Sequence, residues 1–128
     1  MSKAESESPK STLSKPSVLG AHLILELYDC DRMLLADNDR VATELENAVR
    51  GAGAHVVKTA FHEFHPGGVS GVILIAESHV TIHTWPEYGY AAIDVFTCGE
   101  DGLIERLQTN LTSLFRPTQI EARRLKRG

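Results

Sequence analysis

The sequence is poor in the features that mark several large classes of protein. It has only two cysteines, Cys30 and Cys98, among 128 residues, too few for a disulfide framework. Its longest apolar run, residues 72–76, is far too short to cross a bilayer. No apolar leader segment precedes the first cysteine. We therefore expect a cytoplasmic protein with reduced thiols and no membrane contact.

Charge and motif content exclude further classes. The formal net charge is −4, which argues against a nucleic-acid-binding protein. The chain lacks the glycine patterns of dinucleotide-binding and phosphate-binding loops. It also lacks the G-x-S-x-G sequence that surrounds the nucleophile of many hydrolases. His62, His65, His79 and His83 suggest a metal site, but they lack the tight Cys/His or H-E-x-x-H spacing of zinc sites. We expect no bound metal.

Composition and hydrophobic periodicity indicate one folded domain. Apolar residues make up 42% of the chain and charged residues 23%, which are ordinary values for a globular domain of this length. Residues 1–16 contain almost nothing to bury, so we expect them to form a disordered tail. The single domain would then span residues 17–128.

The periodicity predicts six strands and two helices. Alternation of apolar and polar residues predicts strands at residues 18–28, 54–64, 69–76, 79–84, 90–98 and 118–125. Apolar stripes at helical spacing predict helices at residues 38–50 and 103–115. Short turns join most of the strands. We therefore expect an α+β fold: a two-layer α/β sandwich, in which an antiparallel sheet carries both helices on one face.

Most of the reactive side chains lie in the segment from Glu77 to Cys98. A hairpin of strands 79–84 and 90–98 would make Ser78 and Cys98 neighbours in space, although they are twenty positions apart. Ser78, His83 and Cys98 could form a hydrolase-like set, yet a serine at a strand junction is usually structural. Spacing alone therefore supports only a polar site on a hairpin.

The same region carries a long resemblance to a known family. The runs are G-V-S-G at 68–71, A-E-S-H at 76–79, T-I-H-T-W-P-E at 81–87 and G-Y-A-A-I-D-V-F-T-C-G at 89–99. They closely resemble the prokaryotic S-adenosylmethionine decarboxylase proenzymes, which depend on a pyruvoyl group. H-L-I-L-E-L-Y at 22–28 and the F-H-x-F run at 61–64 extend the similarity upstream. A match of this length is far more specific than a short motif.

The resemblance implies a chain that cuts itself between Glu77 and Ser78. The Ser78 hydroxyl would attack the preceding carbonyl, and breakdown of the resulting ester would leave a pyruvoyl group, the covalent cofactor, at position 78. By resemblance, His83 accepts the α-proton during this elimination, and Ser70 assists by hydrogen bonding near the cut carbonyl. The products would be a β chain of residues 1–77 and an α chain of residues 78–128.

The resemblance also implies the reaction of the mature protein. S-adenosylmethionine would form a Schiff base with the pyruvoyl ketone and lose carbon dioxide, and Cys98 would donate the proton that replaces it. Phe64 and Trp85 resemble aromatics that hold the adenine and the sulfonium. Glu87 resembles the carboxylate that binds the ribose hydroxyls. The product would serve spermidine biosynthesis, and family members are typically homodimers of cleaved protomers.

Three departures from the family pattern leave the substrate open. Ala21 stands where the family usually has arginine, and His65 and Gly67 replace larger or differently shaped residues in the loop before Ser70. The D-P-W signature before the last helix is absent, with L-I-E-R at 103–106. A pyruvoyl-dependent arginine or ornithine decarboxylase is one alternative, and a non-enzymatic homologue or subunit is another. Phe64, Trp85 and Glu87 favour S-adenosylmethionine, because a small diamino acid has no adenine or ribose to hold.

Overall fold

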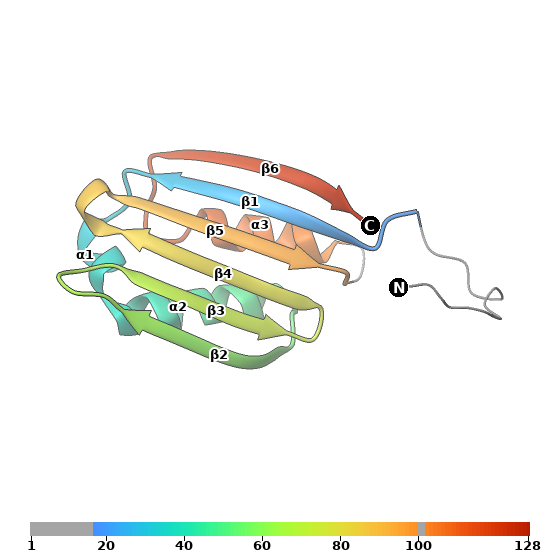
Figure 1. Cartoon of the computed structure of the whole chain (residues 1–128). Coiled ribbons are helices and arrows are strands. Elements are labelled where there is room, and N and C mark those ends of the chain that lie inside the picture. The colour runs from blue at the N-terminus through green and yellow to red at the C-terminus, as the bar shows by residue number, and fades with distance from the viewer. Residues whose placement is uncertain (1–16, 100–101) are drawn as a thin grey trace.

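A six-stranded sheet forms one layer of the structure and the helices form the other (Figure 1). This computed structural model describes residues 17–99 and 102–128, so the tail predicted at residues 1–16 lies outside the described residues. All five strand pairings are antiparallel, and the helices cover one face of the sheet (Figure 1). The predicted α+β sandwich is therefore confirmed.

The elements follow the predicted order, with two short additions. The strands are β1 (Gly20–Tyr28), β2 (Val56–Glu63), β3 (Val69–Ile75), β4 (Ser78–Trp85), β5 (Tyr90–Thr97) and β6 (Gln119–Arg127). The helices are α1 (Arg32–Ala36), α2 (Asn38–Gly51) and α3 (Leu103–Thr112), with a 3-10 turn, η2, at Pro86–Tyr88. The strands lie in the order β2-β3-β4-β5-β1-β6. In the described residues, no helix is both long and apolar enough to span a membrane.

The core lies between the sheet and the helices, where alternation along each strand places it. Leu23, Leu25 and Leu27 of β1 are fully buried, and so are Val80 and Ile82 of β4. Because successive side chains of a strand point to opposite faces, the residues between them reach the other face. The apolar stripes of the two longer helices complete the core: Val41, Leu45 and Val49 of α2, and Leu103, Leu107 and Leu111 of α3.

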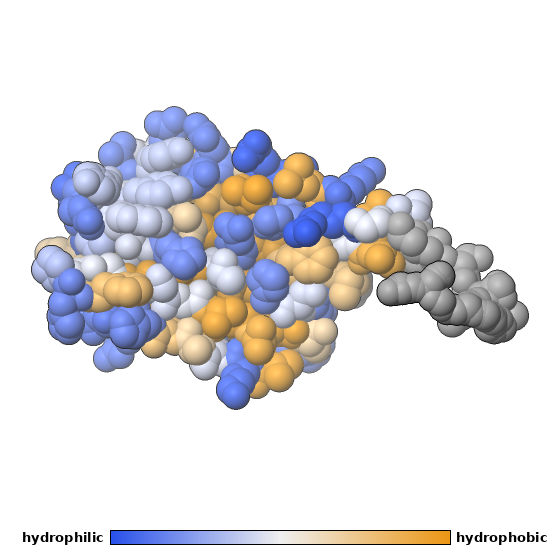
Figure 2. Space-filling view, viewed as in Figure 1, coloured by the Kyte–Doolittle hydropathy of each residue, from blue (hydrophilic) through white to orange (hydrophobic). Residues whose placement is uncertain are grey.

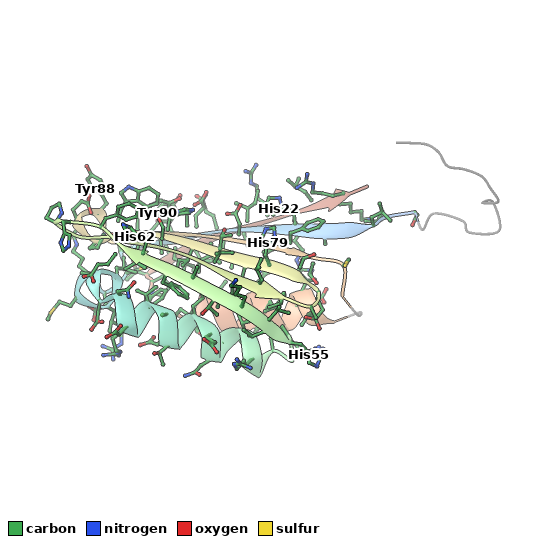
Figure 3. The ribbon with its side chains drawn as sticks, turned by 60° about the horizontal axis from the view of Figure 1, so that its bottom comes forward. His22, His55, His62, His79, Tyr88 and Tyr90 are labelled. Atoms are coloured by element: carbon green, nitrogen blue, oxygen red, sulfur yellow. The ribbon has the colours of Figure 1, made fainter. Side chains whose placement is uncertain are left out.

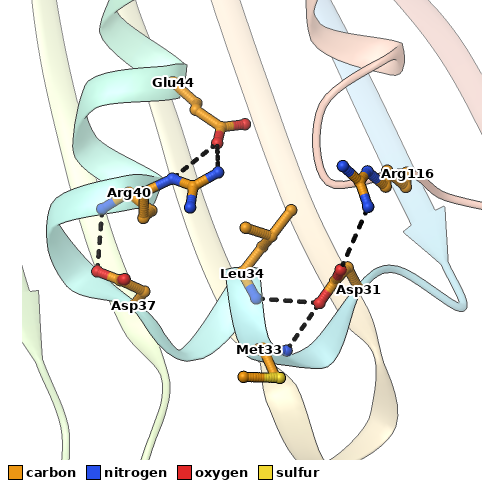
Figure 4. Close-up of polar contacts among 7 residues, drawn as sticks. All are labelled: Asp31, Met33, Leu34, Asp37, Arg40, Glu44 and Arg116. Carbon is orange, nitrogen blue, oxygen red and sulfur yellow. Dashed lines mark hydrogen bonds and ion pairs between the residues drawn. The ribbon is translucent and has the colours of Figure 1, made fainter.

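Two aspartates begin the helices that follow β1 (Figure 4). The Asp37 carboxylate accepts a hydrogen bond from the Arg40 N–H at 3.1 Å, which confirms the predicted start of α2 and satisfies a backbone donor that the helix leaves unpaired. Asp31 accepts from the N–H groups of Met33 and Leu34 in the same way and begins α1. Periodicity could not predict α1, because five residues are too few to show a repeat.

A buried threonine fixes the far end of β4. The Thr84 hydroxyl donates to the Leu35 carbonyl of α1 and accepts from the Val69 N–H of β3, both at 2.9 Å. Its side chain belongs to the core face and is only 6% exposed. Since an unpaired buried polar group is costly, these two bonds hold β3, β4 and α1 in one arrangement. They also set the position of His83 and Trp85, the neighbours of Thr84 in β4.

Candidate active site

The face of the sheet opposite the helices is uncovered in the single chain, and we call it the open face. His22, His79 and Tyr90 project from it in Figure 3, on the side away from the helices. Figure 2, which looks onto this face, shows apolar patches set among polar side chains. Most of the predicted site residues belong to this face or to its two ends. The end at the start of β4 is called the Ser78 end, and the end at Trp85 is called the Trp85 end.

The predicted cut site lies in a tight hairpin turn at the Ser78 end. Ile75 of β3 pairs directly with Ser78 of β4, so the turn between them consists of Ala76 and Glu77 alone. Ser78 also pairs with Thr97 on the other side, which places Cys98 beside the turn. The expected proximity of Ser78 and Cys98 is therefore confirmed by the strand register.

The carbonyl of Glu77, which belongs to the predicted scissile peptide bond, faces two donors from Cys98. The Cys98 N–H donates to this oxygen at 3.0 Å, and the Cys98 thiol donates to it at 3.4 Å. Hydrogen-bond donors aimed at one carbonyl oxygen can stabilise the negative charge that forms there when the carbon is attacked. The arrangement is thus suited to addition of a nucleophile to the Glu77 carbonyl.

Ser78 has an unusual backbone conformation. Its φ angle is +150°, a value that non-glycine residues rarely adopt and that costs about 1–3 kcal/mol. At this angle the Ser78 Cβ is turned towards the preceding carbonyl carbon, whereas in an ordinary strand it is turned away. Attack by the hydroxyl on that carbon closes a five-membered ring, whose torsions must be small. The strained backbone therefore favours the ring closure that self-cleavage requires.

His55, a residue that the sequence did not single out, contacts the side chain of Glu77. Its ring Nδ1 lies 2.8 Å from one carboxylate oxygen, and its backbone N–H donates to the other at 3.2 Å. This hydrogen bonding by His55 lowers the pKa of the Glu77 carboxyl below its ordinary value. The pairing of Val56 with Ile75 brings His55 to the turn, a contact across 22 residues that no local spacing indicates.

Ser70 and His83 form a second polar pair, nearer the Trp85 end. They are direct partners across β3 and β4, and the Ser70 Oγ lies 2.8 Å from the His83 Nδ1. His62 extends this row, because β2 pairs it with Ser70. The structure thus brings together the two residues that the resemblance assigns to assisting self-cleavage, and it leaves the His83 side chain exposed.

An aromatic pocket adjoins this pair at the Trp85 end. A cavity of about 290 Å³ is lined by Phe64, Trp85 and Glu87 together with Ser70 and His83. The rings of Phe64 and Trp85 are 49% and 40% exposed, which leaves their faces available to a flat ligand. The Trp85 ring stacks on Tyr90 with ring centroids 5.3 Å apart. The three residues predicted to bind a nucleoside therefore share one pocket.

The two ends of the open face are well separated within one chain. Ser78 and His83 are five residues apart on one strand, a distance of about 16 Å at the rise of an extended chain. His83 of the same chain therefore cannot reach the Ser78 α-proton. The structure brings Ser78 together with Cys98, and Ser70 together with His83, but it does not bring the two pairs together.

Two polar contacts join side chains of β1 and β5 on the open face. The Tyr90 hydroxyl donates to Glu26, and burial followed by this contact raises the pKa of the Tyr90 phenol well above its usual range. His22 and Asp94 approach to 3.1 Å. Among residues 17–99 and 102–128 no three His, Cys, Asp or Glu side chains gather as a metal-binding group.

Two of the departures from the family pattern, Ala21 and the absent D-P-W signature, lie near Cys98. A cavity of about 280 Å³ is lined by Ala21, Cys98, Ile104 and Glu105 among others. Ala21 belongs to β1, and Ile104 and Glu105 lie at the start of α3. The absence of the family's arginine at position 21 and of its D-P-W signature would therefore change the same wall of this cavity, beside Cys98, the predicted proton donor.

The fold and these contacts define a class: α+β sandwiches with a serine and a cysteine at a strained hairpin turn. The family of this chain follows from its similarity to known proteins: the profile of the S-adenosylmethionine decarboxylase family matches residues 21–128. This chain therefore belongs to the S-adenosylmethionine decarboxylase family, as its resemblance indicated.

Individual relatives agree with this assignment. An S-adenosylmethionine decarboxylase proenzyme of Methanococcus vannielii is 46% identical over 110 residues, which cover 86% of this chain and 90% of the relative. The corresponding proenzyme of Thermotoga maritima is 58% identical over 83 residues; the match spans 65% of this chain and 64% of that relative's length. The crystal structure of the adenosylmethionine decarboxylase from Aquifex aeolicus superposes with a TM-score of 0.82 at 34% identity, covering 88% of this chain and 93% of that one.

Proposed function

We propose that this protein is a self-processing, pyruvoyl-dependent decarboxylase of S-adenosylmethionine. The observation that carries the proposal is the environment of the Glu77–Ser78 peptide bond. Its carbonyl accepts two hydrogen bonds from Cys98, and the Ser78 backbone is strained towards ring closure. Family membership supports the reaction class, and these contacts offer a reason why this bond would be cut.

Self-cleavage would begin at the Ser78 hydroxyl. Its oxygen adds to the Glu77 carbonyl carbon as the hydroxyl proton is lost, and the Cys98 donors stabilise the resulting oxyanion. The carbon–nitrogen bond then breaks, the nitrogen takes a proton, and an ester remains. Loss of the Ser78 α-proton, which only His83 of a partner copy could reach, expels Glu77 as a carboxylate and leaves a dehydroalanine. Water then replaces the nitrogen, ammonia leaves, and the pyruvoyl group is formed.

The strand order explains why the two products would stay together. The β chain would contain β1, β2 and β3, and the α chain would contain β4, β5 and β6. In the sheet, β1 lies between β5 and β6, and β3 lies beside β4. Each product therefore supplies strands on both sides of the other, and separation would require breaking three strand pairings.

Decarboxylation would use residues from both ends of the open face. When present, the pyruvoyl group supplies a ketone for the substrate amine and an electron sink for loss of the carboxylate. Cys98, beside residue 78, would then protonate the substrate Cα. Phe64 and Trp85 would stack against the adenine and the sulfonium, and Glu87 would accept hydrogen bonds from the ribose hydroxyls.

We further propose a homodimer in which each site is completed by the partner copy. The Ser70–His83 pair lies about 16 Å from Ser78 in the same chain, too far for proton transfer. A two-fold axis that lies between two packed open faces and runs perpendicular to the strands would superpose the Ser78 end of one copy on the Trp85 end of the other. The apolar patches on this face (Figure 2) are suited to such burial.

Two free cysteines agree with a cytoplasmic location.

A mass spectrum of the denatured, purified protein tests the main proposal. Two chains divided between Glu77 and Ser78, with a ketone in place of the amine at the start of the α chain, would support it. Carbon dioxide release would then be measured from S-adenosylmethionine, arginine and ornithine in parallel. A single uncut chain would contradict the proposal and favour a non-enzymatic homologue. Release from arginine or ornithine alone would contradict the substrate.

Co-expression of two inactive variants tests the dimer. Ser78→Ala and His83→Ala chains carry different tags, and neither is expected to be cut alone. In a mixed dimer, one site would combine intact Ser78 from the His83→Ala chain with intact His83 from its partner. The His83→Ala chain should therefore be cut only in the mixture. Absence of cutting there, with mixed dimers recovered through both tags, would show that the sites are not shared.

A further inference from the structure

We infer that His55 is a positioning residue for self-cleavage. It holds the side chain of Glu77 and so keeps the scissile carbonyl hydrogen-bonded to the Cys98 donors. The inference rests on the proposed function. The ring of His55 contacts the Glu77 carboxylate, so the influence of this side chain on self-cleavage would pass through Glu77.

Three contacts join His55 to the hairpin turn. The His55 carbonyl accepts from the Ala76 N–H at 2.8 Å. Its backbone N–H donates to one Glu77 carboxylate oxygen at 3.2 Å. Its ring Nδ1 lies 2.8 Å from the other oxygen and donates to it. Both residues of the turn, Ala76 and Glu77, are therefore tied to one residue that lies outside the hairpin.

The opposite side of Glu77 is held by the segment after β5. Cys98 donates twice to the Glu77 carbonyl, and Gly99 packs so closely that an added Cβ would lie 2.9 Å from the Glu77 Cγ. Residue 77 is thus fixed through its side chain on one side and through its carbonyl on the other. Release of the side chain would let the Glu77–Ser78 peptide rotate, and the carbonyl would leave its donors.

Burial explains the size of effect to expect. The Glu77 side chain is only 18% exposed, whereas that of His55 is 79% exposed. Hydrogen bonding by His55 lowers the pKa of the Glu77 carboxyl, although its partial burial acts in the opposite direction. The imidazole faces water, so the ring contact is partly screened. Loss of the ring should therefore slow cleavage without preventing it, because the backbone N–H of residue 55 remains.

A double-mutant cycle on cleavage rate tests the inference. Wild type, His55→Ala, Glu77→Ala and the double variant are made by cell-free synthesis, and the uncut fraction is followed with time. We expect His55→Ala to be cut roughly three- to ten-fold more slowly. The double variant should be no slower than Glu77→Ala, because two residues that act as one unit are not additive. Decarboxylation per pyruvoyl group in the finished His55→Ala enzyme should be unchanged.

Conservative variants separate positioning from a general loss of structure. His55→Asn places an amide N–H near the ring Nδ1 position and should restore most of the cleavage rate, whereas His55→Phe fills the space without a donor and should not. Arg50→Ala removes another exposed ion pair, with Glu46 on α2, and should leave the rate unchanged. Thermal unfolding of uncut Ser78→Ala chains that carry each change checks that the fold is retained.

The outcomes distinguish this inference from the proposed function. Equal cleavage rates for wild type and His55→Ala would overturn the inference while self-cleavage stands. Multiplying effects in the double variant, or no rescue by His55→Asn, would also overturn it. A wild-type chain that stays uncut would overturn the proposed function and the inference together.

Discussion

The Ser78 end and the Trp85 end of β4 differ in whether backbone or side-chain groups form the candidate site. At the Ser78 end the backbone is central: a positive φ at Ser78 and a carbonyl of Glu77 with two donors. At the Trp85 end the side chains are central: a hydrogen-bonded Ser70–His83 pair and an aromatic pocket with a carboxylate. In the proposed function, the first end would change a bond, and the second would bind the substrate and move a proton.

The separation of the two ends has a structural cause. A single antiparallel sheet is rigid, and its strands are too long for side chains at opposite ends to meet. In the proposed homodimer, the partner copy would supply the missing end. Each of the following changes acts at one end and should leave the function of the other intact.

The largest effect is expected from Ser78→Ala. The methyl group cannot attack the Glu77 carbonyl, so no pyruvoyl group forms and activity is lost completely. The Trp85 end should still bind S-adenosylmethionine, since its pocket does not include Ser78. Mass spectrometry and isothermal titration measure the two properties. A cut Ser78→Ala chain would show that the bond between Glu77 and Ser78 is not the one cleaved.

A large effect on turnover alone is expected from Cys98→Ala. The backbone N–H of residue 98 still reaches the Glu77 carbonyl, so the chain should be cut, although more slowly. Removal of the proton donor should lower kcat by about 10²–10⁴-fold. Titration of the pyruvoyl ketone gives the number of active sites, and carbon dioxide release gives the rate. Wild-type turnover per site would mean that another acid protonates the substrate.

At the Trp85 end, Trp85→Ala should weaken binding and leave the cut bond unaffected. Loss of base stacking costs about 1–3 kcal/mol, which corresponds to a rise in KM of roughly five- to 150-fold. Trp85→Phe keeps a stacking ring and is the matched control. An unchanged KM would indicate that adenine is not bound here and would reopen the arginine or ornithine alternative.

The smallest effect is expected from Thr84→Val, which loosens the support of the Trp85 end. Valine keeps the shape but leaves the Val69 N–H and the Leu35 carbonyl without their partner. The unfolding free energy should fall by about 1–3 kcal/mol, seen as a lower Tm. Thr59→Val on exposed β2 is the control. Equal Tm values for Thr84→Val and wild type would show that water or a backbone shift replaces the hydroxyl.

Much of the sheet was predictable because periodicity is a local property. The alternation of Val80, Ile82 and Thr84 with polar neighbours indicated which face is buried, and these three residues lie in the core. Boundaries were less predictable: the last helix ends at Thr112 rather than at residue 115, and α1 was missed. Helix ends and single-turn helices depend on caps and tertiary contacts, which a repeat pattern does not record.

The sequence by itself determined the class of chemistry, because the serine, histidine and cysteine of the hairpin occur in a long pattern shared with one family. It also determined that Ser78 and Cys98 meet, since hairpin register follows from short turns. Only the tertiary structure decided that Ser70 and His83 form a hydrogen-bonded pair across β3 and β4, and that His55 contacts Glu77 across 22 residues. Such relations depend on how strands pair and where they end, and neither is encoded in the spacing along the chain.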